Sequence, residues 1–135
     1  RQMGRTAAGV AAMKLSKDDT IVSADILKDG AKDREILIVT ENGFGKTTPA
    51  KDYKVQKRGG SGIKTVKLTP KTGPIVRGIV ITGEERLEGE LVIMSKKGQV
   101  IKLPLKQVPT LGRQTQGVKV MKMRAGDSIA SVVFV

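Results

Sequence analysis

The chain has 135 residues, of which 39% are apolar and 28% charged, and its formal net charge is +12. It contains no cysteine and no histidine, which excludes disulfides, zinc–thiolate sites and the side chain that most often serves as metal ligand or general base. A chain this basic is expected to bind a polyanion. No apolar run reaches the roughly 18 residues of a membrane span, and we therefore expect a cytoplasmic protein.

The predicted elements are strands, because the apolar runs are short, rich in Val and Ile and bounded by turn residues. In chain order they are 9–15, 20–27, 35–40, a return strand ending near Pro49, 62–68, 75–81, 90–95, a return strand ending near Pro104, 117–123 and 128–135. Asn42-Gly43 and Lys97-Gly98 mark two tight hairpins, and a type I′ turn suits the first. Helix signals are nearly absent, since 16 glycines and 5 prolines interrupt the chain at strand-like intervals.

A gapless internal repeat organises these strands. Residues 35–68 match residues 90–123 at an offset of 55. Each copy contains Arg, three residues, Gly and a β-branched residue, and a partial third copy lies at the N-terminus, so that the motif begins at Arg5, Arg58 and Arg113. A fixed period of this size is typical of arrays of supersecondary units.

About four strands per period match the size of a propeller blade. We expect an all-β fold with roughly two and a half blades of a larger wheel: the end of a blade at 1–17, blades at 18–72 and 73–125, and the start or closing strand of another at 126–135. Since propellers need about four or more blades, the chain is expected to be part of a longer polypeptide. The alternative is a single sandwich or barrel with two similar halves.

Three groups of residues suggest a nucleotide site, a nucleophile or a cation site, and in each case a simpler interpretation is favoured. Residues 43–47 end like a phosphate-binding P-loop but lack its first glycine, and their aligned copy has no such character. Tyr53 aligns with Val108, which favours a packing position over a nucleophile. The acidic groups, Asp18-Asp19 and the pair Glu84-Glu85 with Glu88 and Glu90, are interpreted as solvated loop charge and not as a cation site.

Positive charge is concentrated where the Arg motif occurs. Residues 54–77 carry seven basic side chains and residues 96–124 carry eight, without an acidic residue in either stretch. The glycines of the motif would let the backbone approach a partner closely, with N–H groups free to face phosphate. The expected phosphate contacts are Arg5, Lys14, Lys46, Lys57, Arg58, Lys64, Lys67, Lys102, Arg113, Lys119 and Lys122, and the expected backbone turn at the ligand comprises Gly59, Gly60, Gly62 and Gly117. For Lys14, Lys67 and Lys122 the alternative is that their aliphatic stems cover core.

These motifs resemble the C-terminal domain of the DNA gyrase A subunit or, more widely, that of bacterial type IIA topoisomerases. The resemblance rests on residues 36–46 (Ile-Leu-Ile-Val-Thr-Glu-Asn-Gly-Phe-Gly-Lys), 58–63 and 112–118. Residues 56–62 also match five of the seven positions of that family's gyrase-A box, Gln-Arg-Arg-Gly-Gly-Lys-Gly. The segment is either the box itself or a degenerate copy, because it has Ser61 where the box has Lys.

The resemblance implies a β-pinwheel, a propeller-like wheel that wraps duplex DNA around a basic rim and supports negative supercoiling. The partners that it implies are duplex DNA, an ATPase B subunit, and the remaining blades and catalytic core of a topoisomerase A subunit, gyrase-like or decatenating. The cleaving tyrosine and the ATPase would belong to other domains, so the chain is expected to carry no catalytic residue, no cofactor and no metal.

The composition agrees with binding to the duplex backbone. Two phenylalanines and one tyrosine are the only aromatic residues, which leaves little to stack on bases, and sequence specificity is therefore expected to be weak. Two other functions remain as alternatives: a propeller scaffold for an acidic protein, and a basic β-protein that binds structured RNA.

Overall fold

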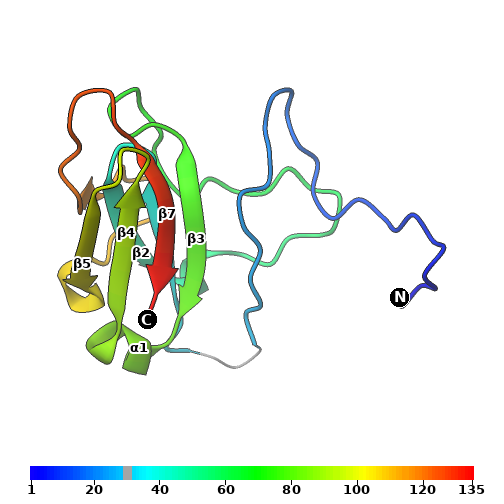
Figure 1. The fold of residues 1–135 in the computed structure, drawn as a ribbon. Coiled ribbons are helices and arrows are strands. Elements are labelled where there is room, and N and C mark those ends of the chain that lie inside the picture. The colour runs from blue at the N-terminus through cyan, green and yellow to red at the C-terminus, as the bar shows by residue number, and fades with distance from the viewer. Residues whose placement is uncertain (29–31) are drawn as a thin grey trace.

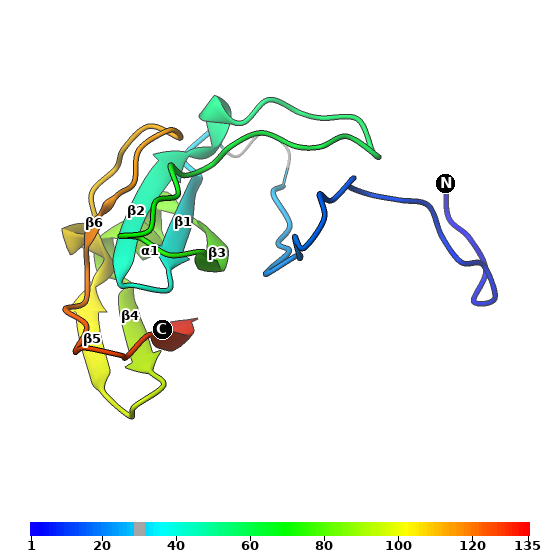
Figure 2. The ribbon, with the colours of Figure 1, turned by 90° about the horizontal axis from the view of Figure 1, so that it is seen from above.

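The computed structural model describes residues 1–28 and 32–135. Its elements are β1 (Glu35–Thr40), β2 (Phe44–Pro49), the 3-10 turn η1 (Ala50–Asp52), β3 (Ile75–Ile81), α1 (Gly83–Glu88), β4 (Glu90–Ser95), β5 (Val100–Pro104), the 3-10 turn η2 (Leu105–Gln107), β6 (Val118–Lys119) and β7 (Ile129–Phe134). The strands gather on one side, while the N-terminal segment and the loop between η1 and β3 extend away from them (Figures 1 and 2). Among the described residues, no helix has the length and apolar character needed to cross a membrane.

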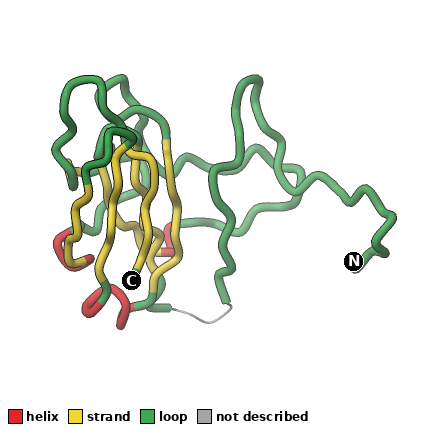
Figure 3. The backbone as a smooth tube through the Cα atoms, in the orientation of Figure 1, coloured by secondary structure: helices red, strands yellow, loops and turns green. Residues whose placement is uncertain are grey.

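Two antiparallel sheets hold the strands, in the orders β3-β1-β2-β6 and β5-β4-β7. Leu37 and Val39 of β1 and Leu91 and Ile93 of β4 are at most 1% exposed and belong to one hydrophobic cluster. Alternate residues of the two strands therefore face a shared core, and the chain is all-β as predicted. Outside the sheets most of the chain is loop (Figure 3).

The predicted repeat is confirmed in three dimensions. The strand β1, the loop, β2 and η1 recur 55 residues later as β4, a loop, β5 and η2. Even an irregularity recurs: the register of β1 against β3 shifts between Val39 and Thr40, and that of β4 against β7 shifts between Met94 and Ser95.

Both predicted hairpins form, but the type I′ turn is wrong. The Gly43 N–H donates to the Thr40 carbonyl and the Gly98 N–H to the Ser95 carbonyl, each at 3.1 Å. Gly43 has φ +85° and Gly98 φ +86°, whereas Asn42 is not among the residues with positive φ. A type I turn followed by one left-handed glycine makes a three-residue loop, which places the glycine after the turn instead of inside it.

The strands predicted at 9–15, 20–27 and 62–68 are wrong, and the strand predicted at 117–123 shortens to β6. Within the described chain, segment 9–15 makes one isolated bridge, between Met13 and Gly60. A strand needs a continuous ladder of backbone partners, and these segments lie outside both sheets.

Segment 20–27 lies beside β3 but contacts it through side chains. The Ser23 hydroxyl accepts from the Gly78 N–H at 3.1 Å, and the Asp25 carboxylate accepts from the Val80 N–H at 3.0 Å. This bond from Val80, with a second from the Ile26 N–H, holds the pKa of Asp25 below its usual value. Because side chains take these N–H groups, no backbone ladder forms at this edge.

The sheets cross the expected blade boundaries. The strand β6 begins at Val118, the last residue of the Arg motif in the second copy, yet Val118 pairs with Gly45 of β2 in the first copy. The strand β3 begins after the boundary expected at 72/73 but pairs with β1, and β7 likewise lies beyond 125/126 but pairs with β4. Each sheet is thus built from more than one of the expected segments.

The helix α1 was not predicted, and Glu84 and Glu85 lie on it and not in a loop. It begins with a capping box: the Thr82 hydroxyl accepts from the Glu85 N–H at 3.0 Å, and the Glu85 carboxylate accepts from the Thr82 N–H at 2.6 Å. The pattern Thr-x-x-Glu is a local signal for such a start, but the segment is too short to show helical periodicity.

Replacing Thr82 with alanine is expected to lower the free energy of unfolding by about 1 kcal/mol, because the Glu85 N–H loses its acceptor. Urea titration followed by circular dichroism measures the change. The control is Thr6→Ala in the exposed N-terminal segment, for which we expect a change within about 0.5 kcal/mol. An equal effect of the two substitutions would contradict the capping role.

Candidate nucleic-acid interface

Each copy of the Arg motif forms a turn at the same place. In the turns at 4–7 and 57–60 the last N–H donates to the first carbonyl, at 3.1 and 3.3 Å. In the turn at 112–115 the Thr115 hydroxyl donates to the Gly112 carbonyl at 2.8 Å. Arg5, Arg58 and Arg113 each occupy the second position of their turn. The third copy, inferred from a short match, therefore shares its local structure with the other two.

The glycine four residues after each arginine has the same backbone conformation. The φ angles are +83° at Gly9, +76° at Gly62 and +81° at Gly117, a region in which other residues are strained. At Gly117 a second constraint applies, because a Cβ atom there would lie 2.7 Å from the Gly45 carbonyl oxygen. The glycine thus lets the segment after the turn pack directly on β2.

Backbone hydrogen bonds connect the three turns in series. The Lys14 N–H, beyond the first turn, donates to the Gly60 carbonyl in the second at 2.9 Å. The Lys67 N–H, beyond the second turn, donates to the Thr115 carbonyl in the third at 3.0 Å. A lysine N–H seven residues beyond one turn is thus hydrogen-bonded to the next turn. The motif arginines are therefore carried on successive turns of one connected array.

Shallow grooves lie at the two junctions. One, of about 460 Å³, is lined by Met13, Lys57 and Arg58 among others. The other, of about 480 Å³, is lined by Lys64 and Lys67 and by Gln114 of the third turn. Both combine the strand-like segment after one turn with the turn of the next copy, and both are bordered by basic side chains.

Most of the predicted phosphate contacts are at the surface. The exposed ones are Arg5, Lys14, Lys57, Arg58, Lys64, Lys67, Lys102, Lys119 and Lys122. Arg113 is half-buried, and one guanidinium nitrogen donates to the Lys64 carbonyl at 2.8 Å. Lys102 pairs with Glu90 at 2.5 Å, so its charge is partly neutralised within the protein.

Two of the backbone N–H groups expected to face phosphate already have protein partners. The Gly59 N–H donates to the Ala12 carbonyl at 2.9 Å, and the Gly60 N–H donates to the Lys57 carbonyl. Gly117 packs on β2. The Gly59 and Gly60 N–H groups therefore serve the turn and the contact between copies, while the expected backbone turn at DNA, formed by these glycines with Gly62 and Gly117, stays a prediction.

Lys46 was also predicted to contact phosphate, and its position contradicts this. It is 1% exposed. Its ammonium group donates to the Gly112 carbonyl at 2.6 Å, the Arg113 carbonyl at 2.7 Å and the Thr115 hydroxyl at 3.1 Å. Burial, with a smaller contribution from the Arg113 charge, lowers the pKa of Lys46 to about 8. No donor of the ammonium group is left for a phosphate, because its three hydrogen bonds all end on the turn at 112–115.

Tyr53 and Val108 occupy equivalent positions, as the repeat predicts. Val108 is fully buried, and the half-buried Tyr53 forms a hydrogen bond with the Thr65 hydroxyl. Both residues follow their 3-10 turns and pack the start of the loop that leads to the Arg motif.

Two basic residues near the hairpin ends, Lys71 and Arg124, were not among the predicted phosphate contacts. The Lys71 and Lys119 ammonium groups lie 5.7 and 5.6 Å from the centroid of the Phe44 ring, within the range of cation–π attraction. In the second copy Gln99 replaces Phe44, and its amide lies beside Arg124; with the amide assigned so that its oxygen faces the guanidinium group, that oxygen accepts from Nε at 2.7 Å. The residue after each hairpin glycine thus holds a cation. Lys71 and Arg124 lie just beyond the matched segments, so the repeat alignment did not single them out.

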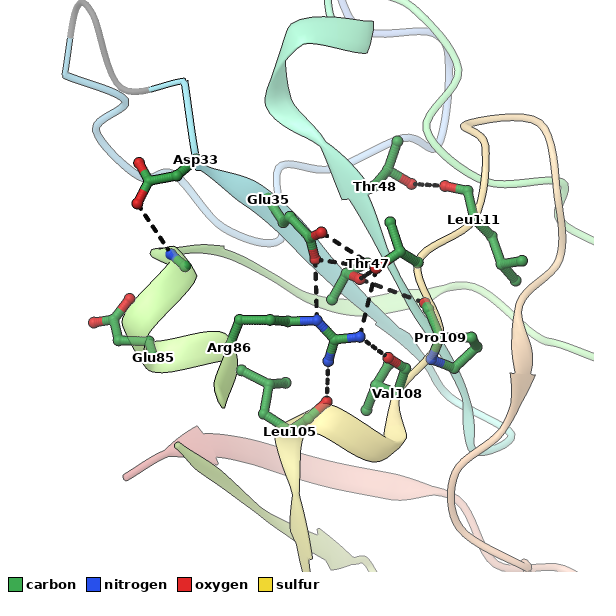
Figure 4. Close-up of polar contacts among 12 residues, drawn as sticks. Asp33, Glu35, Thr47, Thr48, Glu85, Arg86, Leu105, Val108, Pro109 and Leu111 are labelled. Carbon is green, nitrogen blue, oxygen red and sulfur yellow. Dashed lines mark hydrogen bonds and ion pairs between the residues drawn. The ribbon is translucent and has the colours of Figure 1, made fainter. Parts of the chain in front are cut away.

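The Arg86 guanidinium group forms an ion pair and hydrogen bonds within the protein (Figure 4). Its guanidinium Nε lies 3.3 Å from a Glu35 carboxylate oxygen, and the two side chains are 17% and 20% exposed. The other nitrogens donate to the Leu105 and Val108 carbonyls. Arg86 therefore joins α1 to β1, to η2 and to the residue that follows η2.

Comparison with known proteins gives consistent matches. The family described as "DNA gyrase C-terminal domain, beta-propeller" matches residues 1–28, 34–82 and 89–135. The DNA gyrase A subunit of Staphylococcus epidermidis is 41% identical over 132 residues, which are 98% of this chain and 14% of the relative. This chain therefore spans about one seventh of that relative's length.

Two solved structures are similar along almost the whole chain. A structure of the DNA gyrase A C-terminal domain has a TM-score of 0.79 and 28% identity, and the match covers 98% of this chain and 43% of that one. A crystal structure of the C-terminal domain of DNA topoisomerase IV has a TM-score of 0.79 and 25% identity, with 92% and 36% covered.

Proposed function

Because the chain belongs to the family of DNA gyrase C-terminal domains with a beta-propeller fold, we propose that it binds duplex DNA as an accessory domain of a type II topoisomerase. The observation that carries the proposal is the series of three Arg turns, each tied to the next by a backbone hydrogen bond. A row of cations carried on turns that are hydrogen-bonded to one another suits a ligand whose charges are regularly spaced, as those of duplex DNA are.

The contacts are made to phosphates and specify no base sequence. The contact set comprises Arg5, Lys57, Arg58, Lys64, Arg113 and Lys119, with Lys14, Lys67 and Lys122 along the same segments and Lys71 and Arg124 at the hairpin ends. Lysine and arginine in loops and turns position a duplex through its backbone. Lys46 and Arg86 are excluded because their donors end on protein carbonyls.

We expect the duplex to bend along this array and to wrap. Bending 20–30 base pairs costs on the order of 1–6 kcal/mol, and contacts spread over successive turns offset this cost. A wrap of fixed hand presents a DNA segment to the catalytic part of the enzyme, and in this way the domain supports negative supercoiling. The other partners that we propose are an ATPase B subunit and the rest of a topoisomerase A subunit, in the bacterial cytoplasm at the chromosome.

Binding to duplex DNA is expected to weaken steeply with salt. With about two cations of this set per copy in contact with phosphate at any one time, three copies make roughly six contacts, so the logarithm of the binding constant should fall against the logarithm of salt concentration with a slope near −5. Fluorescence anisotropy with 40-base-pair duplexes of unrelated sequence measures the slope. A slope near zero, or no binding at low salt, would contradict the proposal.

Wrapping is tested separately from binding. A relaxed circular plasmid is incubated with the protein and a nicking–closing topoisomerase, the protein is removed, and the linking number is read on a gel. Retained supercoils of one sign are expected. Binding with an unchanged linking number would refute wrapping alone, and preference for structured RNA or for an acidic protein over duplex DNA would favour one of the alternative functions.

A further inference from the structure

A fully buried lysine holds the turn that carries Arg113. Lys46 comes from β2 of the first copy, whereas its three acceptors belong to the turn at 112–115 of the second copy. The contact thus spans 66 to 69 residues of sequence. It is specific to this position, since the residue aligned with Lys46 in the second copy is the apolar Ile101.

The geometry explains why an ammonium group is needed there. The Gly112 and Arg113 carbonyls both point at the lysine Nζ, and the Thr115 hydroxyl, which donates to Gly112, accepts from it. Three N–H donors on one tetrahedral nitrogen satisfy three acceptors that converge from one turn. Without the ammonium group the Gly112 and Arg113 carbonyls would each lose a charged donor, so we expect the lysine to stabilise this shape of the turn.

We propose that Lys46 is a positioning residue for DNA binding: its ammonium group, inaccessible to DNA, fixes the turn at 112–115 so that the Arg113 guanidinium is presented at the surface. The inference rests on the proposed function, because it concerns how one of its contacts is held. The second anchor of Arg113 is the Lys64 carbonyl, which accepts from one guanidinium nitrogen and leaves the others to a phosphate.

The position of Arg113 depends on the protonation of Lys46. A neutral amine has two N–H donors and cannot serve all three acceptors. Arg113 is the charged group that faces the Lys46 ammonium from the turn. On the neighbouring strands, the β1 residue paired with Lys46 is the apolar Ile38. The Lys119 ammonium of β6 lies over the Phe44 ring. With its pKa near 8, Lys46 loses its charge over a range in which ordinary lysines keep theirs.

The test is a double-mutant cycle in duplex affinity. At pH 7 and fixed salt, Lys46→Met and Arg113→Gln are each expected to weaken binding by about three- to tenfold, the loss of one phosphate contact. The double variant is expected to bind no more weakly than Arg113→Gln alone. The matched control is Lys119→Gln, a surface contact on the neighbouring strand, whose effect should multiply with that of Lys46→Met.

A pH series gives a second readout that needs no core substitution. From pH 7 to 9 the affinity of the wild-type protein and of Lys119→Gln should fall, whereas that of Arg113→Gln should stay nearly constant. Losses that multiply in the Lys46 and Arg113 cycle, or the same pH dependence in Arg113→Gln as in the wild type, would overturn the inference. Absence of salt-dependent duplex binding by the wild type would instead refute the proposed function.

Discussion

Replacing Arg86 with alanine is expected to lower the free energy of unfolding by about 3 kcal/mol, since it leaves the Glu35 carboxylate and two carbonyls without their charged donor. The Glu35 and Arg86 side chains are mostly buried, so water replaces the lost contacts poorly. The salt slope of duplex binding should not change, because Arg86 makes no phosphate contact. Urea titration and anisotropy measure the two quantities on the same samples.

The control for Arg86 is Arg77→Ala. Arg77 lies exposed on β3 and carries the same charge, and its removal is expected to change stability by no more than about 0.5 kcal/mol. If Arg86→Ala altered the salt slope by a full unit and left stability unchanged, the internal role would be wrong and Arg86 would belong to the DNA contacts.

Reversing two charges at the second turn is expected to give the largest loss of binding. The variant Lys57→Glu with Arg58→Glu should weaken duplex affinity by about 10- to 100-fold at moderate salt, because two phosphate contacts become repulsive. Its salt slope should be smaller in magnitude by about 2. The loss should be equal for duplexes of unrelated sequence, since phosphate contacts carry no sequence information.

The matched control reverses two lysines in the 3-10 turns, Lys51→Glu with Lys106→Glu. Both are exposed, and the change in net charge is the same. A purely global effect of net charge would weaken binding equally in the two double variants, whereas local contacts predict a much smaller loss in the control. A loss confined to one DNA sequence would contradict backbone recognition.

Much of the architecture could be predicted because the chain contains two alignable copies of one unit, residues 35–68 and 90–123. Two aligned copies identified the hairpins, the packing position at Tyr53 and the recurring Arg turn, and the membership of the propeller family was predicted from the same motifs. Local rules are sufficient for such features, since the turn and the left-handed glycine depend on neighbouring residues.

The features that sequence reasoning missed depend on partners far along the chain. Lys46 is read as a surface lysine until the turn at 112–115 is placed over it, and the N–H groups of Gly59 and Gly60 are read as free until their carbonyl partners are known. The short strand β6 could not be assigned to β2 by local pattern, because its two residues carry too little periodicity. The missing strands have the same cause: their residues favour strands, but no ladder reaches them.

The hydrogen bonds that pass from one Arg turn to the next restrict how this architecture can change in length. The segment after the first turn donates to the second turn, and the segment after the second turn donates to the third. Removing or adding one whole repeat, which measures 53 residues between the first two motif arginines and 55 between the last two, would keep this pattern of junctions, whereas an insertion in the segments that carry these bonds, 8–14 or 61–67, would disturb it. We expect natural variation in the size of such wheels to occur in whole periods, with smaller insertions confined to the hairpin tips and exposed loops.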